Sequence, residues 1–88
     1  MELILMNRGA IFEDLVDFVI KVQGNDVPID EETVELFDSK VLDSLDIMGY
    51  LTYIEKKYGV KITDQDVADR KLGVIRNMIQ FIYERSKG

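Results

Sequence analysis

Histidine and cysteine are absent from the 88 residues of this chain, and proline occurs once, at position 28. Without cysteine, the chain has no disulfide framework and no thiolate of its own. Without either residue, the usual ligands of a structural zinc ion are missing as well. A nucleophilic serine or cysteine also needs a neighbouring base, most often histidine. These absences argue against a self-contained hydrolase, and we expect a protein that is not an enzyme and has no catalytic residues.

Long apolar runs are absent too. No segment approaches the roughly 20 apolar residues that a membrane-spanning helix needs. The apolar segment 1–6 is short and lacks a basic start, so we expect no signal peptide and a cytoplasmic protein. The length predicts a single domain over residues 1–88, and a hydrophobic content of 47% is ample for a packed core.

Basic residues are scarce compared with acidic ones. The chain has 11 basic and 17 acidic residues, which give a net charge of −6. The phosphates of nucleic acids demand a basic surface, so a nucleic-acid partner is not expected. The acidic surplus favours partners that present positive patches. It is concentrated in residues 26–46, where Lys40 is the one opposing base.

Apolar residues recur every three or four positions in two segments, which is typical of amphipathic helices. The first helix is expected over residues 8–23 and the second from Ser44 onward. Glycine accepts the left-handed conformation that ends many helices, so Gly24 and Gly59 are the expected stops. The apolar faces comprise Ile11, Leu15, Phe18, Val19 and Val22 in the first helix, and Leu45, Ile47, Met48, Leu51, Ile54 and Tyr58 in the second.

The remaining segments predict two further helices and two connections. Residues 25–43 form a long connection with apolar anchors, for which we expect a short helical turn at 31–37. Thr63 and Asp66 predict a capping box at the start of a short helix over 64–69. A last helix is expected over 71–86, with Leu72 among its inward-facing residues. The alternation in 60–62 indicates an extended connector, because one strand cannot pair with itself. The expected fold is an all-α bundle of three longer helices and one short helix, with a long first loop.

A metal site is not expected. Asp64, Asp66 and Asp69 lie close together in sequence, but a calcium loop of the EF-hand kind needs a glycine at its sixth position and a glutamate at its twelfth. Those positions hold Asp69 and Ile75. A solvated helix start explains these acids better.

The stretch VLDSLD, residues 41–46, places Ser44 between two aspartates at the start of the second helix. On spacing alone, the favoured role is structural, with Ser44 or Asp43 as the N-cap that accepts an orphan backbone N–H. A functional role is compatible with it. A serine at a helix start is exposed and lies near N–H groups that favour an anion, so an external transferase could attach a phosphoryl group there.

The segment from Asp43 to Thr63, DSLDIMGYLTYIEKKYGVKIT, resembles the Asp-Ser-Leu region of acyl and peptidyl carrier proteins. After its serine that family has acids at plus two and plus eleven, an aromatic at plus fourteen and a β-branched residue at plus eighteen. Those positions here are Asp46, Glu55, Tyr58 and Ile62. The likeness covers roughly residues 8–86 and implies the family's four-helix bundle. A second Asp-Ser pair, at Ser39, is followed by Lys40 and carries little weight.

The resemblance implies that Ser44 carries 4′-phosphopantetheine covalently, and that the thiol of this arm holds an acyl or aminoacyl cargo as a thioester. It implies a monomer that meets a phosphopantetheinyl transferase, an acyl- or aminoacyl-loading synthetase and downstream acyl-processing enzymes. The implied partner contacts are Asp43, Leu45, Asp46, Met48, Thr52 and Glu55. The interior could shelter an apolar cargo among Leu15, Val19, Leu51, Ile54, Ile62 and Ile79, although core packing alone explains these six.

Two departures from the family pattern indicate a specialised carrier. Carriers of fatty acid synthesis usually have more acids along the second helix, whereas Gly49 and Lys56 stand at plus five and plus twelve. The lead-in at 35–44, ELFDSKVLDS, is more similar to stand-alone aminoacyl or D-alanyl carriers. The pathway stays open between fatty acid, polyketide, nonribosomal peptide and D-alanylation chemistry. An alternative function is a helical protein-interaction module in which Ser44 is only an unmodified N-cap.

Overall fold

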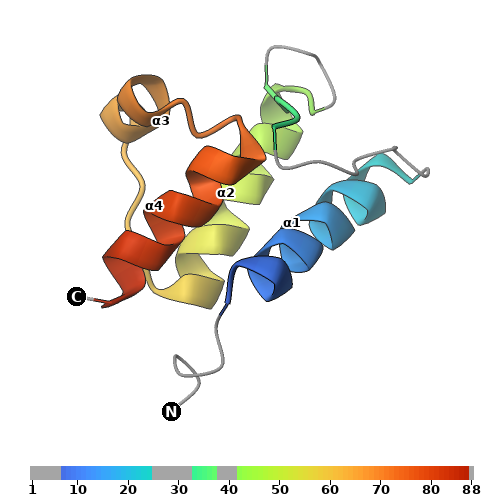
Figure 1. The fold of residues 1–88 in the computed structure, drawn as a ribbon. Helices are drawn as coiled ribbons and strands as arrows, with labels where there is room; N and C mark the ends of the chain where they lie inside the picture. Colours follow the sequence, from blue (N-terminus) through green and yellow to red (C-terminus); the bar gives the residue numbers. More distant parts are fainter. Residues whose placement is uncertain (1–6, 25–32, 38–41, 88) are drawn as a thin grey trace.

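The structure, a computed structural model, describes residues 7–24, 33–37 and 42–87. It contains four α-helices, which are α1 (Arg8–Gln23), α2 (Ser44–Tyr58), α3 (Asp64–Arg70) and α4 (Ile75–Lys87) (Figure 1). Helix α3 is the short one, and the other three are longer. The predicted all-α bundle is therefore confirmed.

The ends of α1 and α2 follow from local chemistry. Asn7 caps α1, because its Oδ1 accepts a hydrogen bond of 2.8 Å from the N–H of Ala10. Both helices end at the predicted glycines, which have positive φ angles of 73° at Gly24 and 68° at Gly59. Each glycine N–H returns to the last turn, to the carbonyl of Ile20 or of Glu55.

The short helix α3 begins at the predicted capping box. Thr63 Oγ1 accepts from the N–H of Asp66 at 3.0 Å, and Asp66 Oδ2 accepts from the N–H of Thr63 at 3.1 Å. The preceding residues 60–62 lie outside any helix or strand, as expected for a connector. Asp69 Oδ2 accepts a hydrogen bond from the side chain of Gln65. The carboxylates of Asp66 and Asp69 thus both accept hydrogen bonds within this segment.

The start predicted for the last helix is wrong by four residues. Residues 71–73 form a turn, Val74 makes an isolated bridge, and α4 begins at Ile75. Leu72 points inward as predicted and is fully buried, but it does so from the turn. Local periodicity could not separate these states, because the apolar spacing continues through the turn.

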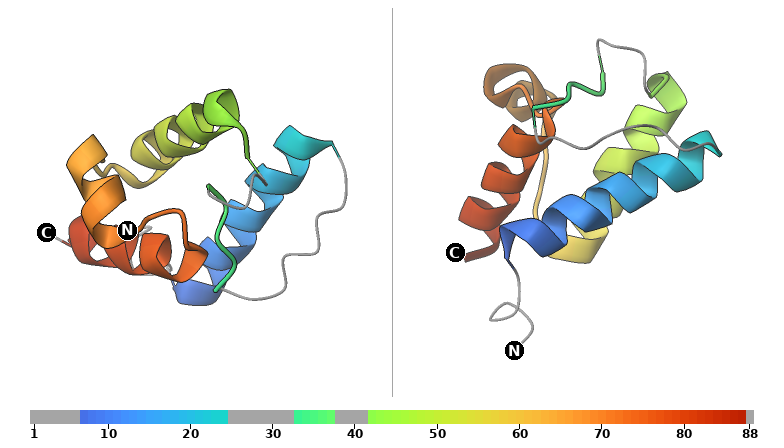
Figure 2. Two further views of the ribbon diagram at one scale, coloured as in Figure 1. Left: turned by 90° about the horizontal axis from the view of Figure 1, so that it is seen from above. Right: turned by 45° about the vertical axis from the view of Figure 1, so that its right-hand side comes forward.

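Segment 33–37 is not the predicted helical turn. Glu35 pairs with Val74 in an antiparallel bridge. The N–H of Leu36 donates to the carbonyl of Gly73 at 2.8 Å, and the N–H of Ile75 donates to the carbonyl of Val34 at 3.2 Å. The backbone therefore finds its partners across the α3–α4 turn instead of within a helix (Figure 2). Residues 31 and 32 of that prediction lie outside the described residues.

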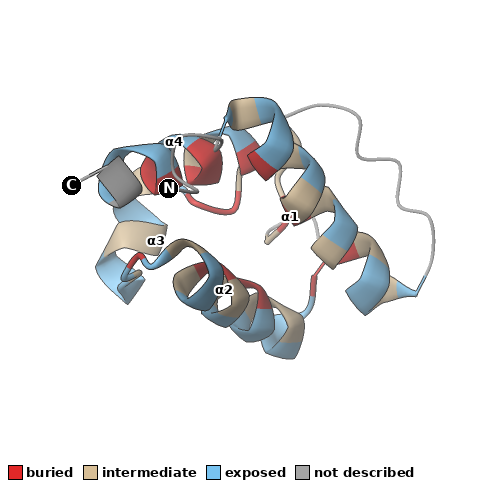
Figure 3. Ribbon diagram, turned by 90° about the horizontal axis from the view of Figure 1, so that it is seen from below, coloured by how far each residue is buried: buried red, intermediate tan, exposed pale blue. Residues whose placement is uncertain are grey.

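The core lies where α1, α2 and α4 face one another (Figure 3). Of the six residues predicted to line the interior, Leu15, Val19, Ile54 and Ile79 are fully buried. Leu51 and Ile62 pack against this core and are partly buried. The buried hydrophobic residues of the described part are Ile11, Leu15, Val19, Leu36, Leu42, Tyr50, Ile54, Val60, Leu72, Ile75, Met78, Ile79, Phe81 and Ile82.

A carboxylate cluster joins α1 to the far end of α2. Asp14 of α1 accepts hydrogen bonds of 2.5 Å from the hydroxyls of Tyr53 and Tyr58, and Lys57 Nζ lies 3.1 Å from its Oδ1. Burial raises the pKa of Asp14, but the hydrogen bonds from the two tyrosines and Lys57 outweigh burial and hold this pKa below its ordinary value. Burial and the bond to Asp14 raise the pKa of Tyr58, so its phenol stays a donor.

We expect Asp14→Asn to lower the free energy of unfolding by about 1.5–3 kcal/mol at pH 7, the range for hydrogen bonds to a charged group. Because the pKa of Asp14 is lowered in the folded chain, its contribution is present above its unfolded pKa of about 3.9. The contribution is lost as pH falls through the lowered folded value. Urea unfolding of wild type and variant should therefore converge in strongly acidic buffer. A difference that stays constant from pH 7 to pH 2 would contradict this role.

Candidate functional site

Ser44 is the first residue of α2, and its side chain is exposed. The N-cap is Asp43, whose backbone is extended and whose Oδ1 accepts a hydrogen bond of 2.8 Å from the N–H of Asp46. The prediction that named Asp43 is confirmed, and the favoured N-cap role of Ser44 is wrong. A capping residue precedes the helix, and Ser44 is already in it. The alternative function, an interaction module, explained Ser44 as an N-cap. Because Asp43 is the cap, that explanation of Ser44 no longer holds.

A pocket of about 350 Å³ adjoins the Ser44 side chain. It is lined by the apolar residues Phe37, Leu42 and Ile47 and by the polar residues Asp43 and Ser44. The N–H groups of the first turn of α2 lie at the positive end of the helix dipole, where an anion is favoured. An anionic group on the Ser44 hydroxyl would thus start at a favourable helix end and beside an apolar hollow.

Two large apolar side chains near Ser44 face solvent. Leu45 is 76% exposed and Met48 is 65% exposed, which is unusual for residues of their size. With Thr52 they follow the spacing of one helix face, and Thr52 is exposed as well. Folding does not bury these side chains, and their implied role as partner contacts stays a prediction.

Glu55 has a structural task that the sequence analysis missed. It is partly buried, and its Oε2 accepts a hydrogen bond of 2.8 Å from the N–H of Ile62. This bond holds the connector at residues 60–62 against α2. An acid seven residues before an apolar residue has no recognisable local pattern, so only the tertiary structure shows the contact.

Gly49 is exposed on α2. No close contact with another described residue requires a glycine at this position. A Cβ built there meets only the ring of Phe18, at 3.9 Å, which is an ordinary contact distance. The glycine therefore lowers helix propensity without a structural need inside the chain.

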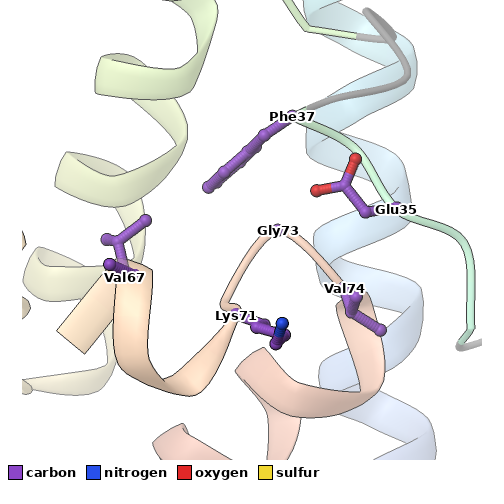
Figure 4. Close-up of a pocket in the computed structure, with 7 residues that line it drawn as sticks. Glu35, Phe37, Val67, Lys71, Gly73 and Val74 are labelled. Carbon is purple, nitrogen blue, oxygen red and sulfur yellow. The ribbon is translucent and has the colours of Figure 1, made fainter.

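A second pocket, of about 340 Å³, is also lined by Phe37 (Figure 4). It is bounded by segment 33–37, α3 and the α3–α4 turn. Its lining residues are Glu35, Phe37, Val67, Ala68, Lys71, Gly73 and Val74. Phe37 therefore borders both pockets. From the sequence, Phe37 is only one of the apolar anchors expected in residues 25–43, and Gly73 has no local pattern that indicates a distant neighbour.

A family model described as a phosphopantetheine attachment site matches residues 13–82. The chain belongs to this family. Members carry 4′-phosphopantetheine covalently on a serine, and the family likeness given by the Asp-Ser-Leu region is confirmed. The protein is therefore a phosphopantetheine carrier, a class of domain that is not itself catalytic and that meets a transferase and biosynthetic enzymes. No solved structure matches the chain.

The residues present fit the group that this family carries. The matched range of the carrier contains two serines, Ser39 and Ser44. Ser44 is exposed at a helix start beside a pocket, as an attachment point requires. Ser39 lies outside the described residues. Within the part of the chain that the structure describes, no helix is long and apolar enough to cross a membrane.

Proposed function

We propose that this protein is an acyl or aminoacyl carrier in a specialised biosynthetic pathway, with 4′-phosphopantetheine attached at Ser44. The observation that carries the proposal is the exposed Ser44 side chain at the first position of α2, where Asp43 already serves as the cap. A hydroxyl that is not needed for the helix end can be modified without loss of the cap.

Several neighbours of Ser44 suit the attached group. Its phosphodiester would start at the first turn of α2, where backbone N–H groups favour negative charge. Phe37, Leu42 and Ile47 offer apolar surface for the part of the arm or cargo nearest the protein. When bound, the group supplies the thiol that the sequence lacks and on which a cargo is held as a thioester.

The proposed docking face lies on α2 and its cap. Leu45, Met48 and Thr52 form its exposed middle. Asp43 and Asp46 add negative charge near Ser44, and Glu55 adds negative charge further along the same face. A partner that fits it has an apolar hollow with a basic rim, because opposite charges steer and orient an encounter. The transferase and the loading enzyme are the proposed partners.

We expect Leu45→Ala and Met48→Ala each to lower the kcat/KM of a transferase for the carrier by about tenfold, as buried apolar anchors at interfaces do. Folding leaves both side chains largely exposed, so the free energy of unfolding should change by no more than about 0.5 kcal/mol. Val22→Ala is the matched control, since Val22 is an exposed apolar residue of α1. Equal rates for all four proteins would exclude this docking face.

The charge pattern along α2 supports a specialised pathway. Its last turn contains Lys56 and Lys57, and Lys57 is bound to Asp14 of α1. The acidic part of the face is therefore confined to the end near Ser44 and to Glu55. Efficient extension of the loaded protein by fatty acid synthesis enzymes would contradict this part of the proposal.

The decisive experiment is an intact mass spectrum. The purified chain is incubated with coenzyme A, magnesium and a transferase of broad specificity, and the wild type is expected to gain one phosphopantetheine group. A folded wild type that gains no mass with several such transferases would contradict the proposal.

A further inference from the structure

The hydroxyl of Tyr50 is buried without a hydrogen-bond partner. Tyr50 is fully buried, and its Oη is the one buried side-chain polar atom among the described residues for which no partner is found. Such an atom has lost its water without replacement, which is unfavourable in the folded state. A phenylalanine would fill nearly the same volume without that cost. The stability of the fold therefore does not explain why position 50 has a tyrosine and not a phenylalanine.

The ring of Tyr50 packs against the ring of Phe37. Their ring centroids are 6.0 Å apart with an interplanar angle of 89°, so one ring meets the edge of the other. Tyr50 also contacts Phe18 of α1, with the ring centroids 6.0 Å apart. Phe37 borders both the pocket beside Ser44 and the pocket at Gly73. A displacement of the Phe37 ring would therefore open a path from either pocket toward Tyr50.

The interior around Tyr50 is otherwise apolar. Apart from the Tyr50 hydroxyl, the buried side chains of the described residues are hydrophobic, and none is charged. A cargo chain that enters from the Ser44 pocket would thus meet one polar group there. The pocket beside Ser44, at about 350 Å³, has the size of a small ligand site.

We propose that Tyr50 determines cargo specificity, by donating a hydrogen bond to an oxygen on the chain of a bound acyl group once Phe37 has moved. The substrate class is then acyl groups that carry a hydroxyl or carbonyl along the chain, in preference to saturated ones. This inference rests on the proposed function, because it needs a cargo tethered at Ser44.

The first test uses the unloaded protein. Tyr50→Phe is expected to raise the melting temperature by about 4 °C or more, because it removes an unpaired buried hydroxyl and keeps the ring. Tyr83→Phe, on the more exposed Tyr83 of α4, is the control. A melting temperature of Tyr50→Phe that does not rise would show that the hydroxyl already has a partner in the folded chain, and would overturn the inference.

The second test compares cargoes. A transferase loads the wild type and Tyr50→Phe from hexanoyl-, 3-hydroxyhexanoyl-, 3-oxohexanoyl- and 5-oxohexanoyl-coenzyme A. The rate of thioester cleavage by hydroxylamine is then divided by the rate for the same free acyl-coenzyme A. In the wild type, at least one oxygenated cargo should be protected about three- to tenfold better than hexanoyl, the factor that one hydrogen bond gives.

In Tyr50→Phe this preference should disappear, while Tyr83→Phe should keep it. Equal protection of all four cargoes in the loaded wild type would overturn the inference and leave the proposed function standing. A wild type that gains no mass at all would contradict the proposed function and the inference together. The two failures are thus distinguished by the mass spectrum.

Discussion

Ser44→Ala is expected to abolish the gain of phosphopantetheine completely, because the attached oxygen is removed. The same variant should keep its fold. Asp43 supplies the cap of α2, and alanine is a good helix former at an exposed position. We expect the free energy of unfolding to change by no more than about 0.5 kcal/mol.

Asp43→Ala provides the matched contrast. It removes the Oδ1 that accepts from the N–H of Asp46, so it should cost about 1 kcal/mol of stability while leaving the serine oxygen in place. Intact mass spectra and urea unfolding of both variants separate the chemical role of Ser44 from the structural role of Asp43. Ser39→Ala should gain mass as the wild type does.

Loading of Ser44→Ala would locate the attachment elsewhere. A large stability loss in Ser44→Ala, with none in Asp43→Ala, would instead reverse the two roles. Either result would contradict the assignment of the hydroxyl as free for modification.

Gly73→Ala is expected to destabilise the protein by about 1–3 kcal/mol through overpacking. A Cβ built at Gly73 would overlap the carboxylate of Glu35 and would lie 2.9 Å from two ring atoms of Phe37. The carboxylate can swing aside, but the Phe37 ring cannot move without leaving its packing against Tyr50. The loss corresponds to a melting temperature lower by about 4–8 °C for each kcal/mol.

Gly49→Ala is the matched control and should act in the opposite direction. Its Cβ meets only an ordinary contact with Phe18, so the gain in helix propensity should stabilise the chain by about 0.5–1 kcal/mol. Thermal unfolding of the two variants under the same conditions checks both signs. A Gly73→Ala protein as stable as wild type would mean that segment 33–37 can shift away at little cost.

Gly73 also matters for the site. The carbonyl of Gly73 accepts from the N–H of Leu36, so the glycine allows segment 33–37 to lie against the α3–α4 turn. That placement puts Phe37 between the two pockets and over Tyr50. Gly73→Ala should therefore displace Phe37 and so alter the pocket beside Ser44.

The sequence by itself determined the features that depend on neighbours a few residues apart. The periodic apolar spacing placed α1 and α2, Gly24 and Gly59 ended them, and Thr63 with Asp66 started α3. These signals are readable because helix faces, glycine stops and capping boxes depend on residues within one or two turns. The exposed position of Ser44 at a helix start was predictable for the same reason.

Only the tertiary structure decided the contacts that join distant segments. It paired Glu35 with Val74, placed Phe37 beside Ser44 and over Tyr50, and brought Asp14 to the tyrosines of α2. It also separated the cap from the adjacent serine, since both side chains could accept a backbone N–H and only the backbone conformation distinguishes them. Such choices depend on the packing of segments that are far apart in the sequence, and no local pattern encodes them.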